Sequence, residues 1–273
     1  MVYQEYLPHP VLAPYVRCYW SLALAPSKDL ASSQRFRFLA EGVEVTFNFA
    51  GPVAIDSGDR PSRTAQTACL SGPMTRSMRM QYSGSLDLLG VCFRPGGAYP
   101  FFPCPASEIV DACTSVDDLL GSAGLRLVEL VQNEATAQER VAALDAFFLA
   151  QLGGARHDDV RIRRALGSIE SLGGRVSVDQ LARLAGLSNR QLERRFKECV
   201  GIPPKQLCRS LRFKNVFKCL TRHPAEQWAS VAASCGYYDQ SHMINEFRRF
   251  TGMSPTAYFE RPPGQDSLFV GNF

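Results

Sequence analysis

The spacing of hydrophobic and polar residues differs between the two halves of the chain. It predicts strands in the first hundred residues and helices after them. In the first hundred residues, short β-branched or aromatic runs are separated by Gly, Pro, Ser and Asp, which predicts strands. The expected strands are residues 15–24, 35–39, 43–49, 67–70, 77–82 and 86–93. In residues 43–49, Val43, Val45, Phe47 and Phe49 share one face while Glu44, Thr46 and Asn48 take the other. This part of the chain is predicted to be a small β-rich domain, either a barrel or a folded sheet.

Helical spacing follows the last strand. The paired glycines of residues 93–98 favour a sharp turn into a short helix at residues 98–102. Such a turn could cradle an anion on its backbone N–H groups, but a turn that only redirects the chain is the better interpretation. Residues 116–120, 122–132 and 136–151 are expected to be helices. The last two are amphipathic, and their apolar faces serve either as a dimer surface or as a cover for their own sheet.

Residues 177–200 predict two short helices joined by a tight turn. Ser177 with Gln180 and Ser188 with Gln191 each fit the Ser-x-x-Gln capping box that starts a helix. Gly186 can take the left-handed conformation that ends the first helix. The first helix has an apolar face formed by Val178, Leu181, Ala182, Leu184 and Ala185. This order of signals is typical of a helix-turn-helix motif.

The second helix of this motif has a polar outer face. Leu192, Phe196 and Val200 recur every four residues and therefore face inward. The outer face then carries Asn189, Arg190, Glu193, Arg194 and Lys197. A basic surface rich in bidentate donors suits the major groove of DNA.

The motif returns 51 residues later in an imperfect second copy. FKECVGIPP, with Phe196, Gly201 and Pro204, is echoed by FRRFTGMSP, with Phe247, Gly252 and Pro255. A helix at residues 226–234 and another from about Asp239 leave Gln240, Ser241, Ile244, Asn245 and Arg248 outside. Residues 205–221 have helical spacing and would span roughly 25 Å. A strut of that length could hold two recognition helices about one DNA turn, ~34 Å, apart.

Residues 157–260 resemble the DNA-binding domain of the AraC/XylS family of bacterial transcription regulators. The resemblance rests on GYYDQSHM at residues 236–243, FRR at 247–249, GMSP at 252–255 and Tyr258. It implies an α+β chain with an all-α DNA-binding domain of two helix-turn-helix motifs joined by a linker helix. The order of the halves also resembles family members that have an N-terminal sensing domain, whose usual fold is a cupin-like β barrel. The expected domains are residues 1–154 and 155–263, with residues 264–273 as a tail.

The resemblance also implies which side chains reach DNA. Base edges would be contacted by Asn189, Arg190, Glu193 and Arg194 in the first motif and by Gln240, Ser241, Ile244 and Asn245 in the second. Phosphates would be contacted by Lys197, Arg248 and Ser188. Asn245 departs from the family pattern, in which Arg or Lys is frequent at this position. The implied partners are double-stranded DNA, a second copy of the chain, a small-molecule effector and, for an activator, RNA polymerase.

Charge supports the same division of the chain. The net charge is +4, but residues 155–263 hold 19 basic against 10 acidic residues while residues 1–154 carry a net charge of −4. The basic half is therefore the expected nucleic-acid binder.

No apolar run approaches the ~18–20 residues of a membrane span, and residues 1–20 lack the pattern of a secretory signal. We expect a cytoplasmic protein whose nine cysteines are mostly small buried hydrophobic residues, without a disulfide framework or a zinc site.

Two other classes of protein remain to be weighed. A metal-binding cupin enzyme needs a His and carboxylate cluster, yet only His9 of the four histidines lies in the β-rich half. A repair methyltransferase fused to this kind of domain would resemble Pro-Cys-His-Arg at its nucleophile, whereas residues 103–106 read Pro-Cys-Pro-Ala. We therefore expect no enzyme and no cofactor. A regulator without a small-molecule input, whose N-terminal half only dimerises or contacts another protein, stays open.

Overall fold

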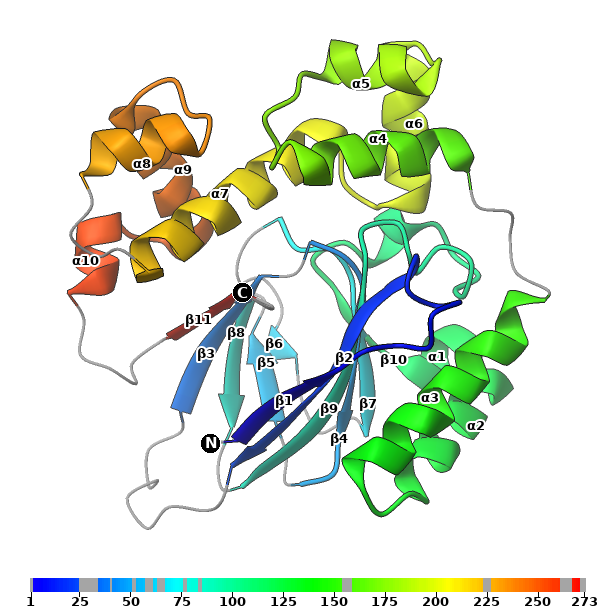
Figure 1. Ribbon diagram of the computed structural model, residues 1–273. Helices are drawn as coiled ribbons and strands as arrows, with labels where there is room; N and C mark the ends of the chain where they lie inside the picture. Colours follow the sequence, from blue (N-terminus) through cyan, green and yellow to red (C-terminus); the bar gives the residue numbers. More distant parts are fainter. Residues whose placement is uncertain are drawn as a thin grey trace.

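The chain is an α+β protein with a β-rich N-terminal part and a helical C-terminal part (Figure 1). A computed structural model describes residues 2–24, 34–39, 41–50, 53–56, 61–62, 67–75, 78–82, 85–153, 159–222, 227–260 and 267–270. The expected boundary between the two domains, at residues 154 and 155, lies outside these ranges, and so does His157. Among the described residues no helix is long and apolar enough to cross a membrane.

The strands form two sheets. The first is antiparallel, in the order β1 (Val2–Tyr6), β2 (Val16–Leu24), β9 (Leu86–Phe93), β4 (Glu44–Asn48), β7 (Ala68–Ser71) and β10 (Cys113–Ser115). The second has the order β11 (Ser267–Val270), β3 (Gln34–Leu39), β8 (Met78–Tyr82), β5 (Val53–Asp56) and β6 (Pro61–Ser62). The six expected strands are confirmed, and β1, β5, β6, β10 and β11 are additional.

Helices cover one face of the first sheet. They are α1 (Val116–Leu120), α2 (Ser122–Gln132) and α3 (Ala137–Leu152), which begins at a capping box formed by Thr136 and Glu139. Val45 and Phe47 of β4 share one buried cluster with Leu127 of α2 and Phe148 of α3. The helices therefore pack on their own sheet, as one of the two interpretations of their apolar faces predicted.

The opposite face of the first sheet is also buried. Cys18, Trp20, Leu86, Leu88 and Cys92 form a second apolar cluster there. Glu44 of β4 lies on the same side, is 7% exposed and accepts a hydrogen bond from Trp20 Nε1 at 2.5 Å. In the centre of this sheet, at β9 and much of β2 and β4, both faces therefore carry buried side chains.

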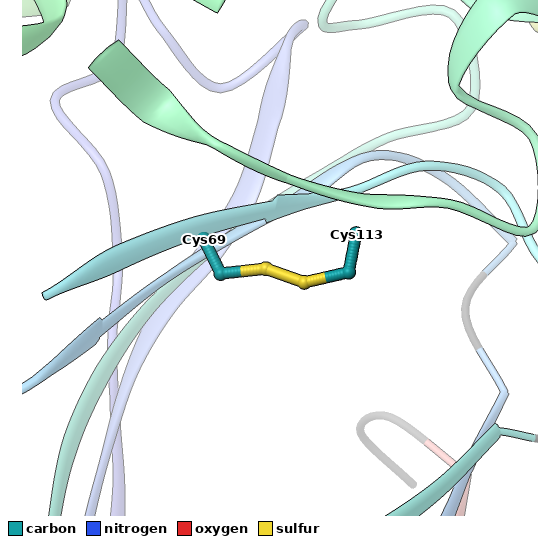
Figure 2. Close-up of a disulfide and its surroundings, with 2 residues drawn as sticks. All are labelled: Cys69 and Cys113. Carbon is teal, nitrogen blue, oxygen red and sulfur yellow. A yellow bond between two sulfur atoms is a disulfide. The ribbon is translucent and has the colours of Figure 1, made fainter. Parts of the chain in front are cut away.

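A disulfide joins the last two strands of the first sheet. Cys69 of β7 and Cys113 of β10 lie on paired strands, with their Cα atoms 6.2 Å apart, and Figure 2 shows the bond between their side chains. We expected no disulfide framework and mostly free, buried cysteines, and this one disulfide departs from that expectation. Sequence patterns could not indicate this bond, because the two cysteines are 44 residues apart and only strand pairing brings them together.

The C-terminal part is built from helices. In order they are α4 (Val160–Ser171), α5 (Val178–Ala185), α6 (Asn189–Cys199), α7 (Pro204–Arg222), α8 (Trp228–Ser234), α9 (Gln240–Thr251) and α10 (Pro255–Phe259). Two buried clusters, one around Phe196 and one around Phe247, give each helix-turn-helix motif its own core. The expected tail contains β11, which pairs in parallel with β3 and brings the end of the chain back to the N-terminal part (Figure 1).

The turn after β9 joins the two parts of the protein. Residues 98–102 form turns and not the expected helix. Gly97 lies so close to the Tyr15 carbonyl that a Cβ atom would come within 2.1 Å of its oxygen, and the backbone of Gly96 is left-handed. Arg94 of this turn forms an ion pair with Glu170 of α4 at 3.1 Å. The turn thus redirects the chain and docks on the C-terminal part.

The N-terminal part contacts both helix-turn-helix motifs. Tyr99 donates a hydrogen bond to Glu198 of α6 at 3.0 Å, and the backbone of Ala106 approaches Gly201 at the end of the first motif. Met74, from the segment after β7, is 2% exposed and belongs to the core cluster of the second motif. Both motifs are therefore held against the same domain.

Candidate nucleic-acid interface

The first motif has the turn that its sequence predicts. Ser177 and Ser188 each form a complete capping box, with Gln180 and Gln191 respectively. Gly186 has a φ of 65°, the left-handed conformation that ends α5. The N–H of the following residue, Leu187, donates to the Ala182 carbonyl at 2.9 Å and closes the turn. Both predicted capping boxes are confirmed.

Helix α6, the first recognition helix, has a buried face and an exposed face. Leu192 and Phe196 are fully buried, as their spacing predicts. The predicted DNA contacts, all exposed, are Ser188, Asn189, Arg190, Glu193, Arg194 and Lys197. Arg195 is instead turned toward the protein, where it pairs with Asp159 at 3.7 Å and with Glu198 at 3.1 Å. Within the described part of the chain no ion pair holds Arg190, Arg194 or Lys197, so their charges stay available to a ligand.

Helix α4 supports the first recognition helix from behind. Its N-cap residue Asp159 accepts the backbone N–H of Arg161 and a side-chain N–H of the same residue. The hydrogen bond from the Arg161 side chain is the main reason that the pKa of Asp159 is lowered. Asp159 is therefore ionised at neutral pH and can hold Arg195.

The second motif reaches the same geometry with a different turn. Cys235 caps α8, and Gly236 follows with a left-handed φ of 77°. Asp239 then caps α9 by accepting the His242 N–H at 2.7 Å. A single Asp thus takes the place of the Ser-x-x-Gln box of the first motif.

Helix α9, the second recognition helix, also has an exposed polar face. Gln240, Ser241, Asn245 and Arg248 are exposed, whereas Ile244 is half-buried and packs at the edge of the second core. Met243 and Phe247 are buried, so the predicted helical phase is confirmed. Trp228 of α8 also packs against this core.

Glu246 is a buried charge of the second motif that periodicity did not single out. It is 5% exposed and forms an ion pair with Arg209 Nε of α7, while Arg212 lies 3.7 Å from its second oxygen. Tyr237 lies beside these groups, and its pKa is raised, first by burial and then by the charge of Glu246. This cluster ties α9 to the helix that joins the two motifs.

That joining helix, α7, is the linker helix. Its 19 residues correspond to about 28 Å of helix. It contacts α4 and α6 of the first motif and α8 and α9 of the second. One rigid element therefore carries both recognition helices, one near each of its ends (Figure 1).

Two family matches divide the chain in the same way as its architecture. Residues 4–115 match a family described as a domain of unknown function, DUF6597. Residues 181–261, which include α6 and α9, match a family described as a helix-turn-helix domain.

Curated relatives are transcription regulators. The HTH-type transcriptional activator RhaS of Escherichia fergusonii is 30% identical over 135 residues, which cover 49% of this chain and 48% of the relative. The probable transcriptional regulator LumQ of Photobacterium leiognathi is 36% identical over 84 residues, 31% of this chain and 34% of the relative. The chain thus spans about half, or less, of the length of these relatives. Among solved structures, ToxT from Vibrio cholerae aligns over 94% of this chain and 98% of its own, with 10% identity and a TM-score of 0.46.

These matches define the class of the C-terminal part, which is a helix-turn-helix domain. The motif of residues 236–258, which carried the resemblance to the AraC/XylS family, lies within this domain.

Proposed function

We propose that this protein is a sequence-specific regulator of transcription that places α6 and α9 in successive major grooves of double-stranded DNA. The observation that carries the proposal is the exposure of the polar faces of both helices, which are mounted on one linker helix. In this proposal Asn189, Arg190, Glu193, Arg194, Gln240, Ser241, Ile244 and Asn245 contact base edges, while Ser188, Lys197 and Arg248 contact phosphates.

The test is a selection from random duplex DNA with the full chain, followed by affinity measurements on the selected site. Arg194→Ala should cost about 1–3 kcal/mol of binding free energy and relax the preference at one base pair. Arg126→Ala, measured on a duplex that holds a single site, is the matched control, because Arg126 is an exposed arginine of α2 outside the helix-turn-helix domain. Failure to enrich any sequence, or equal losses in the two variants, would refute the proposal.

The proposed domains are residues 1–154, which sense or dimerise, residues 155–263, which bind DNA, and the tail at residues 264–273. The protein is proposed to work in the cytoplasm, without a catalytic activity or a cofactor, with RNA polymerase as a further partner if it activates transcription. An N-terminal domain that only dimerises or contacts another protein is the alternative to one that also senses a ligand.

We also propose that the N-terminal domain forms a homodimer through α2 and α3. Leu125 and Leu130 of α2 support this interface, because they are 59% and 39% exposed on a helix whose other face is buried. Leu125→Glu should shift the full chain toward the monomer in sedimentation. A dimer should bind DNA with two linked sites about 100-fold more tightly than a monomer does, and the variant should lose this gain. A wild-type chain that sediments as a monomer would exclude this interface.

A further inference from the structure

A large cavity lies between the N-terminal domain and the helix-turn-helix domain. Its volume is about 770 Å³. The N-terminal domain contributes residues between Pro10 and Arg17, Glu41 and the turn at Arg94, and the other domain contributes α4 and α7. Sites for small molecules usually occupy about 300–1,000 Å³ and often lie between domains. The cavity therefore has the size and the position of a metabolite site.

Its walls are rich in positive charge. Five cationic side chains line it, namely Arg17, Arg94, Arg163, Lys214 and Lys218, against two carboxylates, Glu41 and Glu170. Glu170 is engaged with Arg94 at 3.1 Å, and Glu41 lies 3.7 Å from Lys214. The cavity walls therefore carry three more basic than acidic side chains.

Several of these groups are withdrawn from water. Lys214 is 7% exposed and Glu41 8%. Arg17 Nε and Glu41 Oε1 are buried and have no hydrogen-bond partner in the part of the chain that the structure describes. Buried polar groups that lack a partner carry a desolvation cost that a polar ligand can offset.

The charges around Lys214 also favour a bound anion. Its pKa is lowered, mainly by burial and further by the positive charges of Arg17 and Lys218, although Glu41 opposes the change. Lys214 is therefore repelled by two neighbouring cations of the cavity, Arg17 and Lys218. A bound anion would relieve this repulsion.

We propose that this cavity binds a small hydrophilic polyanion, a metabolite that carries two or more carboxylate or phosphate charges. Arg17, Lys214 and Lys218 hold the charges, and Glu41 accepts a hydrogen bond from a hydroxyl or N–H group of the same molecule. The walls belong to both domains, so the ligand bridges the N-terminal domain to α4 and to the linker helix. This site lies outside the DNA-binding face.

The experiment is isothermal titration of the full chain, without DNA and at constant ionic strength set with sodium chloride. The probes are citrate, pyrophosphate and inorganic phosphate, which distinguish a carboxylate from a phosphate ligand. We expect saturable binding of one citrate or one pyrophosphate per chain. Lys218→Met should weaken it by about tenfold or more, the effect of one lost charge-assisted hydrogen bond.

Lys205→Met is the matched control, because Lys205 is an exposed lysine of the same helix that does not line the cavity. Its affinity for the probe should equal that of the wild type. Lys214→Met should also weaken binding of the probe, because Lys214 lines the cavity. If this buried substitution prevents folding, the test of the cavity rests on the Lys218 variant. The proposal is overturned if none of the three probes binds saturably, or if Lys218→Met and Lys205→Met bind the probe equally well. Since DNA is absent from the titration, either result leaves the proposed DNA binding untouched.

Discussion

Glu246 of the second recognition helix is bound by Arg209 of the linker helix in a buried ion pair. The position 51 residues earlier, which is its counterpart in the first motif, is Arg195, and that side chain pairs with Asp159 at the start of α4. At equivalent positions the first recognition helix therefore contributes a positive charge and the second a negative charge, and the two helices are bound to different parts of the protein. The first is held by the helix behind it, and the second by the linker helix itself.

Removing the Glu246 carboxylate should destabilise the second motif. Glu246→Ala leaves Arg209 and Arg212 without their buried partner, and breaking such a pair costs about 3–5 kcal/mol. Chemical denaturation of the full chain measures the free energy of unfolding, and hydrogen exchange should show the loss in the amides of α9. Glu260→Ala, at the exposed end of α10, is the control and should change little. Unaltered exchange in α9 would show that the pair does not hold this helix.

The sequence predicted the cores of the two motifs because local periodicity determines them. Phe196 and Phe247 stand at equivalent points of a four-residue spacing, and both are buried. Glu246 could not be found in the same way, since it stands next to outward-facing Asn245 and its partner Arg209 lies 37 residues away. A polar residue on a helix is normally expected to face water. Only the packing of α9 on α7 turns this one into a buried group.

At two places the structure departs from the predictions made from the sequence, because it depends there on tertiary contacts. The paired glycines at 96 and 97 predicted a turn, which is present, but a helix after it does not form. Gly97 is required by the close approach of the Tyr15 carbonyl, from a segment far away in the sequence. The Cys69–Cys113 disulfide depends in the same way on the pairing of β7 with β10. Period and composition contain no information about such contacts.

Phosphate contacts should be visible in the salt dependence of DNA binding. Each phosphate neutralised by a side chain contributes about 0.9 to the slope of log K against log salt. Lys197→Ala and Arg248→Ala should each lower the slope by about one and weaken binding to all sequences alike. Asn245→Ala is the contrasting variant, because a neutral side chain that contacts a base changes the sequence preference and not the slope. If the slope of log K against log salt is the same in the two charge variants and in the wild type, Lys197 and Arg248 do not contact phosphates.

Burial of Glu44 should make the stability of the N-terminal domain depend on pH. Burial raises the pKa of its carboxyl to about 8, and the charge of Cys92 adds to this, while the Trp20 hydrogen bond and Arg17 oppose it. In the unfolded chain a glutamate titrates near about 4.3. Between these two values the folded state binds a proton that the unfolded state does not. The stabilising contribution of this proton is therefore complete below the unfolded pKa and is lost as the pH rises toward about 8.

Glu44→Gln tests this dependence, because the amide stays neutral and its oxygen can still accept the Trp20 N–H at the same place. The free energy of unfolding of the variant, relative to the wild type, should increase by up to about 1.4 kcal/mol per pH unit between about pH 5 and about pH 8. Denaturation of both full-length proteins at several pH values in this window measures the difference. Two curves that run parallel would mean that Glu44 titrates alike in the folded and unfolded chains, and that water reaches this face of the sheet.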